Sequence, residues 1–136
     1  MKILSIFATL FICLNLEAKL VHESSIALSG HNPEKWGLKH IKTHLGEGYF
    51  KFNELLEVKT TTSKISKKRF NENMGLIRKL ESDLAKQSES NTAICSRKLI
   101  VQSKQNKNSI SNTYCLDKLP DQELATVSKT IQKLKN

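Results

Sequence analysis

The sequence predicts an α+β domain in which a small antiparallel sheet carries two packed helices. Three features of the chain lead to this prediction: an apolar stripe at helical spacing between residues 70 and 84, two strand-like runs around a polar tip between residues 99 and 116, and a second helical stripe between residues 124 and 134. A segment of strands, a helix, a hairpin and a last helix is the element order expected of an α+β domain. The C-terminal part should therefore be a disulfide-bridged hairpin followed by a terminal helix.

The first 18 residues have the pattern of a cleavable signal peptide, with a single lysine, an apolar run from Ile3 to Leu14 and a small residue, Ala18, at the cleavage site. This apolar run is too short to cross a bilayer core of about 30 Å, so no transmembrane anchor is expected. A lipoprotein is the alternative because the run contains Cys13, but bulky Ile12 precedes that cysteine where a small residue is needed. We expect a mature chain of residues 19–136, forming a single domain in the periplasm or outside the cell.

The first part of the mature chain predicts short extended segments. Residues 25–28 form a candidate strand before Gly30. Residues 33–45 fit either a helix that begins after an asparagine cap and a proline, or a strand. We favour the strand, because Gly46, Glu47 and Gly48 form a candidate hairpin turn before a second strand at 49–52. Two further short extended pieces are expected at 55–58 and 63–66, and a polar loop at 87–92.

The first predicted helix begins after Ser66, whose side chain is a good helix cap. Its apolar residues follow one another at steps of three or four, which places them on one face of a helix. They are Phe70, Met74, Ile77, Leu80 and Leu84. Gly75 lies inside this helix and is expected to cost about 1 kcal/mol relative to alanine.

Two cysteines define the predicted hairpin. Cys13 is removed with the signal peptide, which leaves Cys95 and Cys115 as an even pair in an exported protein and predicts a disulfide. If Cys95 lies directly opposite Cys115 in antiparallel strands, residue 99 pairs with 111 and the turn is centred on Gln105. Opposed residues in such strands have Cα atoms about 4.5 to 5.5 Å apart, which a disulfide can span.

The terminal helix is predicted to begin at Pro120. Asp121 and Glu123 in its first turn, with Lys133 and Lys135 near its end, match the helix dipole. Its apolar stripe consists of Leu124, Val127, Ile131 and Leu134. Such a stripe usually packs on a core, so we expect this helix to cover the sheet.

The chain is strongly basic, with 22 lysines and arginines against 13 acidic residues and a net charge of +9. Removal of Lys2 and Glu17 with the signal peptide leaves that charge unchanged. An acidic protein or an anionic polymer is the partner class that this charge favours. Arginine, the better residue for phosphate and base recognition, occurs at three positions only, and tyrosine and tryptophan are few, so no specific nucleic acid is expected.

The densest basic cluster consists of Lys64, Lys67, Lys68 and Arg69. Its position at the start of the first helix is unfavourable for cations, because the helix dipole is positive there. This makes the cluster a candidate anion-binding site. A solvated lysine-rich face in a lysine-rich protein is the alternative interpretation.

His40 and His44 are the candidate metal or acid-base pair. On a helix their side chains would be neighbours, whereas on a strand they would lie about 13 Å apart, too far to chelate one ion. Ile41 stands where a His-Glu-x-x-His metalloprotease has its glutamate. We therefore expect no metal, no cofactor and no catalytic residue, although the metal expectation depends on the strand assignment of residues 33–45.

The function expected from the sequence is that of an exported, non-enzymatic binding or accessory protein. Two alternatives come from the same residues. One is a small exported hydrolase that uses His40 and His44. The other is a cationic protein that binds anionic polymers of the cell envelope or of a host.

Overall fold

The computed structural model describes residues 18–56, 58–87 and 94–136. The predicted signal peptide, apart from Ala18, and residues 88–92 of the predicted loop lie outside the described residues.

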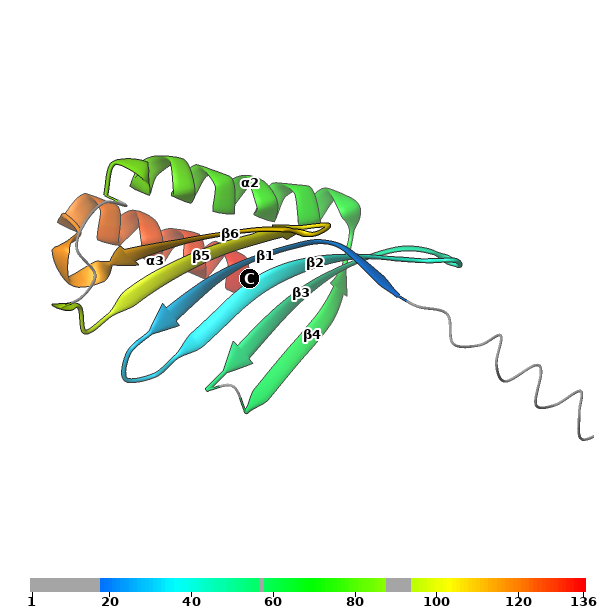
Figure 1. The fold of residues 1–136 in the computed structure, drawn as a ribbon, viewed down its shortest axis with the longest axis horizontal. Helices are drawn as coiled ribbons and strands as arrows, with labels where there is room; N and C mark the ends of the chain where they lie inside the picture. The colour runs from blue at the N-terminus through cyan, green and yellow to red at the C-terminus, as the bar shows by residue number, and fades with distance from the viewer. Residues whose placement is uncertain (1–17, 57, 88–93) are drawn as a thin grey trace, which may run out of the picture.

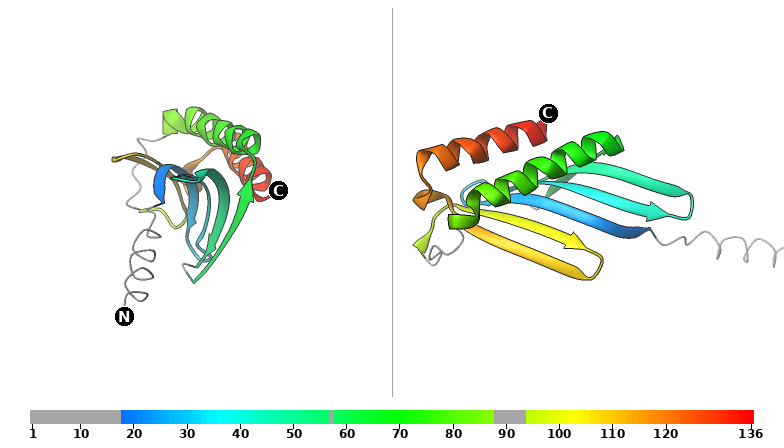
Figure 2. Two further views of the ribbon diagram at one scale, coloured as in Figure 1. Left: turned by 90° about the vertical axis from the view of Figure 1, so that its right-hand side faces the viewer. Right: turned by 90° about the horizontal axis from the view of Figure 1, so that it is seen from above.

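Six antiparallel strands form one sheet, and two helices lie on one side of it (Figures 1 and 2). The strands are β1 (Lys19–Ser29), β2 (Glu34–Thr43), β3 (Gly46–Leu55), β4 (Lys59–Ile65), β5 (Lys98–Gln105) and β6 (Asn108–Cys115), in the sheet order β4-β3-β2-β1-β5-β6. The helices are α2 (Lys67–Leu84) and α3 (Asp121–Lys135), with short 3-10 turns η1 (Ala85–Gln87) and η3 (Leu116–Lys118). The predicted α+β class is confirmed. Among the described residues no helix combines the length and the apolar character needed to cross a membrane.

The core lies between the helices and the side of the sheet that faces them, which we call the helix-facing side; the opposite side is the outer side. The sheet contributes alternate residues of β1, β2, β5 and β6, because successive strand residues point to opposite faces. These are Ile26, Trp36, Leu38, Leu99, Val101 and Tyr114, against Phe70, Met74, Ile77, Leu80 and Leu84 of α2 and Val127, Ile131 and Leu134 of α3.

The central strand β1 is much longer than the sequence indicated. The prediction was restricted to residues 25–28, but β1 runs from Lys19 to Ser29 and pairs with β2 on one side and with β5 on the other. Its first half contains polar residues such as Ser24, which carry little strand propensity. Hydrogen bonds to β2 and β5 stabilise the extended conformation that the local sequence favours only weakly.

Most of the segment 33–45 forms a strand, β2 (Glu34–Thr43), as we favoured, but the predicted turn is misplaced. Thr43 pairs with Gly46, so the turn is His44 and Leu45, and Gly46 to Gly48 belong to β3. The Thr43 hydroxyl stabilises this turn by donating to the Gly46 carbonyl and accepting from the Leu45 amide, each at 3.2 Å. Likewise, Leu55 ends β3, and Leu56 and Val58 lie in the turn before β4, so the expected extended piece at 55–58 is wrong; residue 57 lies outside the described residues.

Helix α2 agrees with its prediction. The Ser66 side chain accepts the Arg69 amide at 3.2 Å, which caps the helix as expected. All five residues of the predicted stripe are buried. The terminal helix α3 is also confirmed, with Pro120 directly before it and acidic residues in its first turn.

The predicted disulfide between Cys95 and Cys115 is present, with 5.8 Å between the Cα atoms, but the predicted register of the hairpin is wrong. Lys98, not Cys95, lies opposite Cys115, and Leu99 pairs with Tyr114. The turn is consequently centred between Asn106 and Lys107, and Asn106 adopts a φ of 54° there. Cys95 reaches its partner from the segment before β5, so a disulfide did not require the two cysteines to be opposed in the ladder.

Gly37 allows an aromatic ring to lie flat on the outer side of the sheet. A Cβ atom at this position would be 2.2 Å from Cζ of Phe52, on the neighbouring strand. The amino groups of Lys35 and Lys39 lie 5.7 and 4.7 Å from the centre of the Phe52 ring, and Phe52 is only 5% exposed. The glycine therefore makes room for the Phe52 ring, which lies between Gly37 and two lysine side chains on a side of the sheet that no helix covers.

Substitution of two glycines should change stability in opposite directions. Gly37→Ala should lower the free energy of unfolding by about 1 to 3 kcal/mol, because the new methyl group overlaps the Phe52 ring. Gly75→Ala should raise it by up to about 1 kcal/mol, because Gly75 lies in α2 and no atom lies within 4 Å of the place that the new methyl group would take. Urea unfolding of both variants measures the change in the free energy of unfolding. The loss caused by Gly37→Ala should largely vanish in a Phe52→Ala background. A Gly37→Ala variant as stable as the wild type would contradict the contact with Phe52.

Removal of the disulfide should destabilise the protein without changing its secondary structure. The bridge closes a loop with a sequence separation of 20 residues. In the chain-entropy model a loop of this length corresponds to about 2 to 4 kcal/mol of stability. Urea unfolding of a Cys95→Ala/Cys115→Ala variant, with far-ultraviolet circular dichroism as the control, measures the loss. Modification of both cysteines by a thiol reagent in the unreduced, denatured protein would show that the bridge does not form.

Candidate functional site: a cleft beside the edge strand

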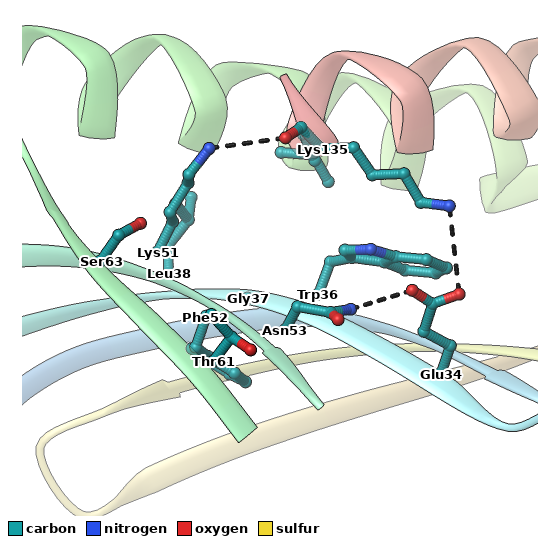
Figure 3. A pocket seen from close by; sticks show the side chains of 11 residues that line it. Glu34, Trp36, Gly37, Leu38, Lys51, Phe52, Asn53, Thr61, Ser63 and Lys135 are labelled. Carbon is teal, nitrogen blue, oxygen red and sulfur yellow. Dashed lines mark hydrogen bonds and ion pairs between the residues drawn. The ribbon is translucent and has the colours of Figure 1, made fainter. Parts of the chain in front are cut away.

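A cleft of about 380 Å³ lies between the end of α3 and the helix-facing side of strands β2, β3 and β4 (Figure 3). Strand β4 is an edge strand, and all of its residues except Ile65 are exposed. The helices cover the centre of the sheet and leave this corner open. Volumes of this size are typical of sites for small molecules.

The register of the three strands brings the side chains of the cleft together in two rows. Trp36 pairs with Asn53, which pairs with Thr61. Two residues further along β2, Leu38 pairs with Lys51, which pairs with Ser63. Because alternate residues of a strand share one face, both rows point to the helix-facing side.

The floor of the cleft is apolar and well packed. Trp36 is 5% exposed, Leu38 is 1% exposed, and Leu134 of α3 is 7% exposed. The Lys135 amino group lies 4.8 Å from the centre of the Trp36 ring, so the end of α3 rests on the indole (Figure 3). This contact places a rigid aromatic surface next to the open side of the cleft.

Glu34 is held at one end of the cleft. Its Oε1 accepts from Asn53 Nδ2 at 3.0 Å, and its Oε2 lies 4.0 Å from Lys135 Nζ. Lys51 lies at the other end, beside Ser63 (Figure 3), and donates to the main-chain carbonyl of Lys135 at 3.4 Å. The two ends of the cleft thus differ: one contains a paired carboxylate, and the other a lysine whose contact is a main-chain oxygen.

Of the two histidines in the candidate metal pair, His40 belongs to a second polar group on the helix-facing side. Its Nε2 lies 3.2 Å from Glu47 Oε2, and its ring stacks on Tyr49 at 4.5 Å between centres. The Tyr49 hydroxyl donates to the same carboxylate oxygen at 2.9 Å. These two hydrogen bonds lower the pKa of Glu47, whereas burial and the nearby carboxylate raise the pKa of Tyr49.

His44 does not join this group. It lies in the exposed turn between β2 and β3. His40 and His44 therefore stand at separate places on an extended hairpin, as the strand interpretation requires. Whether either binds a metal stays a prediction.

His22, which the sequence analysis did not single out, is the neighbour of His40 across the sheet. Its Nε2 lies 3.2 Å from Ser24 Oγ and 3.4 Å from Ser103 Oγ, and its ring packs edge-on against Phe70 of α2. Burial lowers the pKa of His22, and the charges of Arg78 and His40 lower it further. No sequence pattern marks this pair, because residues 22 and 40 meet only when β1 pairs with β2.

The basic cluster is divided by the fold. Lys64 lies opposite Phe50 on the outer side of the sheet, since its neighbour Ser63 points into the cleft. Lys68 and Arg69 instead line a hollow between the start of α2 and the end of α3. The Arg69 guanidinium donates to the main-chain carbonyl of Asn136. Lys67 is exposed in the first turn of α2, so the four residues do not form one continuous surface.

Asp117 organises the segment that carries the disulfide. Its Oδ2 accepts from the Ser96 hydroxyl at 2.6 Å and the Ser96 amide at 2.9 Å, and its Oδ1 accepts from Arg97 Nε at 3.1 Å. These hydrogen bonds, those from Ser96 first, lower the pKa of Asp117 to about 2. Asp117 and the two cysteines lie within 4.8 Å of one another, but sulfurs bonded in a disulfide are not thiolate ligands for a metal.

Comparisons of the chain with protein-family models, with curated proteins and with solved structures found no match. The function must therefore be inferred from the residues and their geometry.

Protonation of His22 should make the stability depend on pH. The lowered pKa means that the unfolded chain binds a proton at this residue more readily than the folded chain does. The contribution of neutral His22 is thus fully present above about pH 6.5 and is lost as the pH falls below that value. Urea unfolding between pH 7.5 and about pH 5 should show a smaller pH dependence for His22→Gln than for the wild type. His31→Gln, at an exposed turn position, is the control; an unchanged slope in His22→Gln would contradict the assignment.

Proposed function

We propose that this chain is an exported binding or accessory protein without enzymatic activity, and that it holds its ligand in the cleft beside β4. The observation that carries the proposal is the composition of this cleft. An apolar floor of Trp36, Leu38 and Leu134 is surrounded by hydroxyl, amide and amino groups from neighbouring strands. A mainly apolar pocket with a few directed polar groups is the usual form of a small-molecule site.

Export is supported by two observations of different kinds. The first 18 residues have the composition of a signal peptide. The disulfide between Cys95 and Cys115 belongs to an oxidising compartment, such as the periplasm or the extracellular space. A small exported binding protein in one of these compartments accounts for both.

Binding, rather than catalysis, agrees with the state of the ionisable groups in the cleft. The carboxylate of Glu34 already accepts from Asn53 and faces the Lys135 amino group. A general acid or base needs instead to be within reach of a substrate proton. The carboxylate of the cleft is thus engaged by neighbouring side chains, as expected for the wall of a binding site.

The alternatives receive less support from the geometry. A hydrolase that uses His40 and His44 needs both side chains at one centre, whereas His40 contacts Glu47 and Tyr49 and His44 lies in an exposed turn. A cationic polymer-binding protein needs a continuous basic face. Lys64 and Lys68 lie on different surfaces, so the basic cluster of the sequence does not supply one.

The cleft can be tested with a neutral aromatic probe, N-phenyl-1-naphthylamine. Trp36 is the single tryptophan of the chain and lines the cleft, so energy transfer from Trp36 to a bound probe reports binding directly. We expect saturable one-to-one binding that is lost in Thr61→Phe, because the phenyl ring fills the space between β4 and the end of α3. Thr62→Phe, the next residue on the same strand, points to the outer side and should bind as the wild type does. Equal binding by both variants would contradict a ligand site in this cleft.

A further inference from the structure

The charges around the cleft are unequal at its two ends. At the Glu34 end, negative and positive groups balance, because the carboxylate faces the Lys135 amino group at 4.0 Å. At the other end, Lys51 is half-buried, and among the described residues no carboxylate lies within ion-pair distance of it. The cleft therefore carries an uncompensated positive charge at one end.

Among the described residues, the hydrogen bond that Lys51 makes is weak. Its amino group donates to the Lys135 carbonyl at 3.4 Å, which is long for a bond from a charged donor. The negative end of α3 stabilises this cation in part, as helix C-termini do. An ammonium group has three protons, however, and the remaining two are available to a second acceptor. Partial burial of a lysine without a counter-ion is unfavourable. An anion bound at this point would therefore be stabilised by the charge of Lys51.

The surroundings of Lys51 suit such an anion. Ser63 lies directly opposite Lys51 on the neighbouring strand and places a hydroxyl donor beside the Lys51 side chain (Figure 3). On the other side, Leu38 lies opposite Lys51 in the register, and Trp36 continues the apolar floor. A ligand with a charged group at Lys51 and Ser63 would therefore extend its apolar part over Trp36.

We propose that the cleft selects a small organic anion, with a carboxylate or a similar oxyanion bound by Lys51 and Ser63 and an apolar body against Trp36. This inference rests on the proposed function, since it names the chemical class of ligand for the same cleft. The volume of about 380 Å³ limits the ligand to a small molecule. The proposed anion site is distinct from the lysine cluster at the start of α2, because Lys51 is not a member of that cluster.

Two probes with nearly the same aromatic body test the charge preference. The probe 8-anilinonaphthalene-1-sulfonate carries a sulfonate that N-phenyl-1-naphthylamine lacks. The wild-type protein should bind the sulfonate probe about tenfold more tightly than the neutral probe, as a charge-assisted hydrogen bond implies. Lys51→Met, which keeps most of the length of the side chain and removes the charge, should weaken binding of the sulfonate probe about tenfold and so abolish this preference.

Lys104→Met is the matched control. Lys104 is an exposed lysine of β5, a strand that does not line the cleft, and its substitution removes the same net charge. It should leave both affinities unchanged, which separates a local effect of Lys51 from the overall charge of the protein. Thr61→Phe should block both probes, which shows that the sulfonate binds inside the cleft.

The outcomes distinguish the two proposals. If the neutral probe binds in the cleft but Lys51→Met leaves the preference for the sulfonate intact, the anion inference is wrong and the binding site stands. An equal loss of sulfonate affinity in Lys51→Met and Lys104→Met would also overturn it, because the effect would then come from net charge. If neither probe binds to the wild type, or if Thr61→Phe binds both normally, the cleft is not the ligand site and both proposals fail.

Discussion

The packing of the α2 stripe against the central strands is the interaction on which the other features depend. A sheet in which every strand is antiparallel can leave one side to solvent, but its other side must be covered. Helix α2 supplies five buried apolar residues to that side, and α3 adds its own stripe beside it. Two helices are not wide enough to cover six strands. The position of the two helices on the sheet therefore determines which strands stay uncovered on the helix-facing side.

The open corner is at β4, because both helices lie over the centre of the sheet. Strands β2 and β3 pack against Phe70 of α2 through His40 and Tyr49, and nearer to β4 they are covered by the end of α3 at Leu134 and Lys135. The candidate ligand site is thus a direct consequence of incomplete coverage. The contact of Lys135 with the Trp36 ring sets the inner wall of the cleft, and β4 forms the outer wall.

The other end of the sheet is closed by different means. Strand β6 ends at Cys115, and the disulfide attaches the segment before β5 to this point. The carboxylate of Asp117 also binds Ser96 and Arg97. The segment before β5 is therefore joined to the segment after β6 both by the disulfide and by these hydrogen bonds. This end of the sheet is thus cross-linked, while the strands at the opposite edge line the open cleft.

The sequence by itself determined the elements whose signal is local. The stripe from Phe70 to Leu84, the cap at Ser66 and the stripe of the terminal helix repeat within a few residues, and helix hydrogen bonds also close within a few residues. The two cysteines outside the predicted signal peptide were enough to predict their bond. Only the tertiary structure decided the full length of β1, the turn at His44, the register of the last hairpin, and the meeting of Trp36, Lys51 and Ser63. These features depend on the pairing of strands. The stability of a strand pair depends on side chains of the neighbouring strand, and the local sequence does not show which strand that neighbour is.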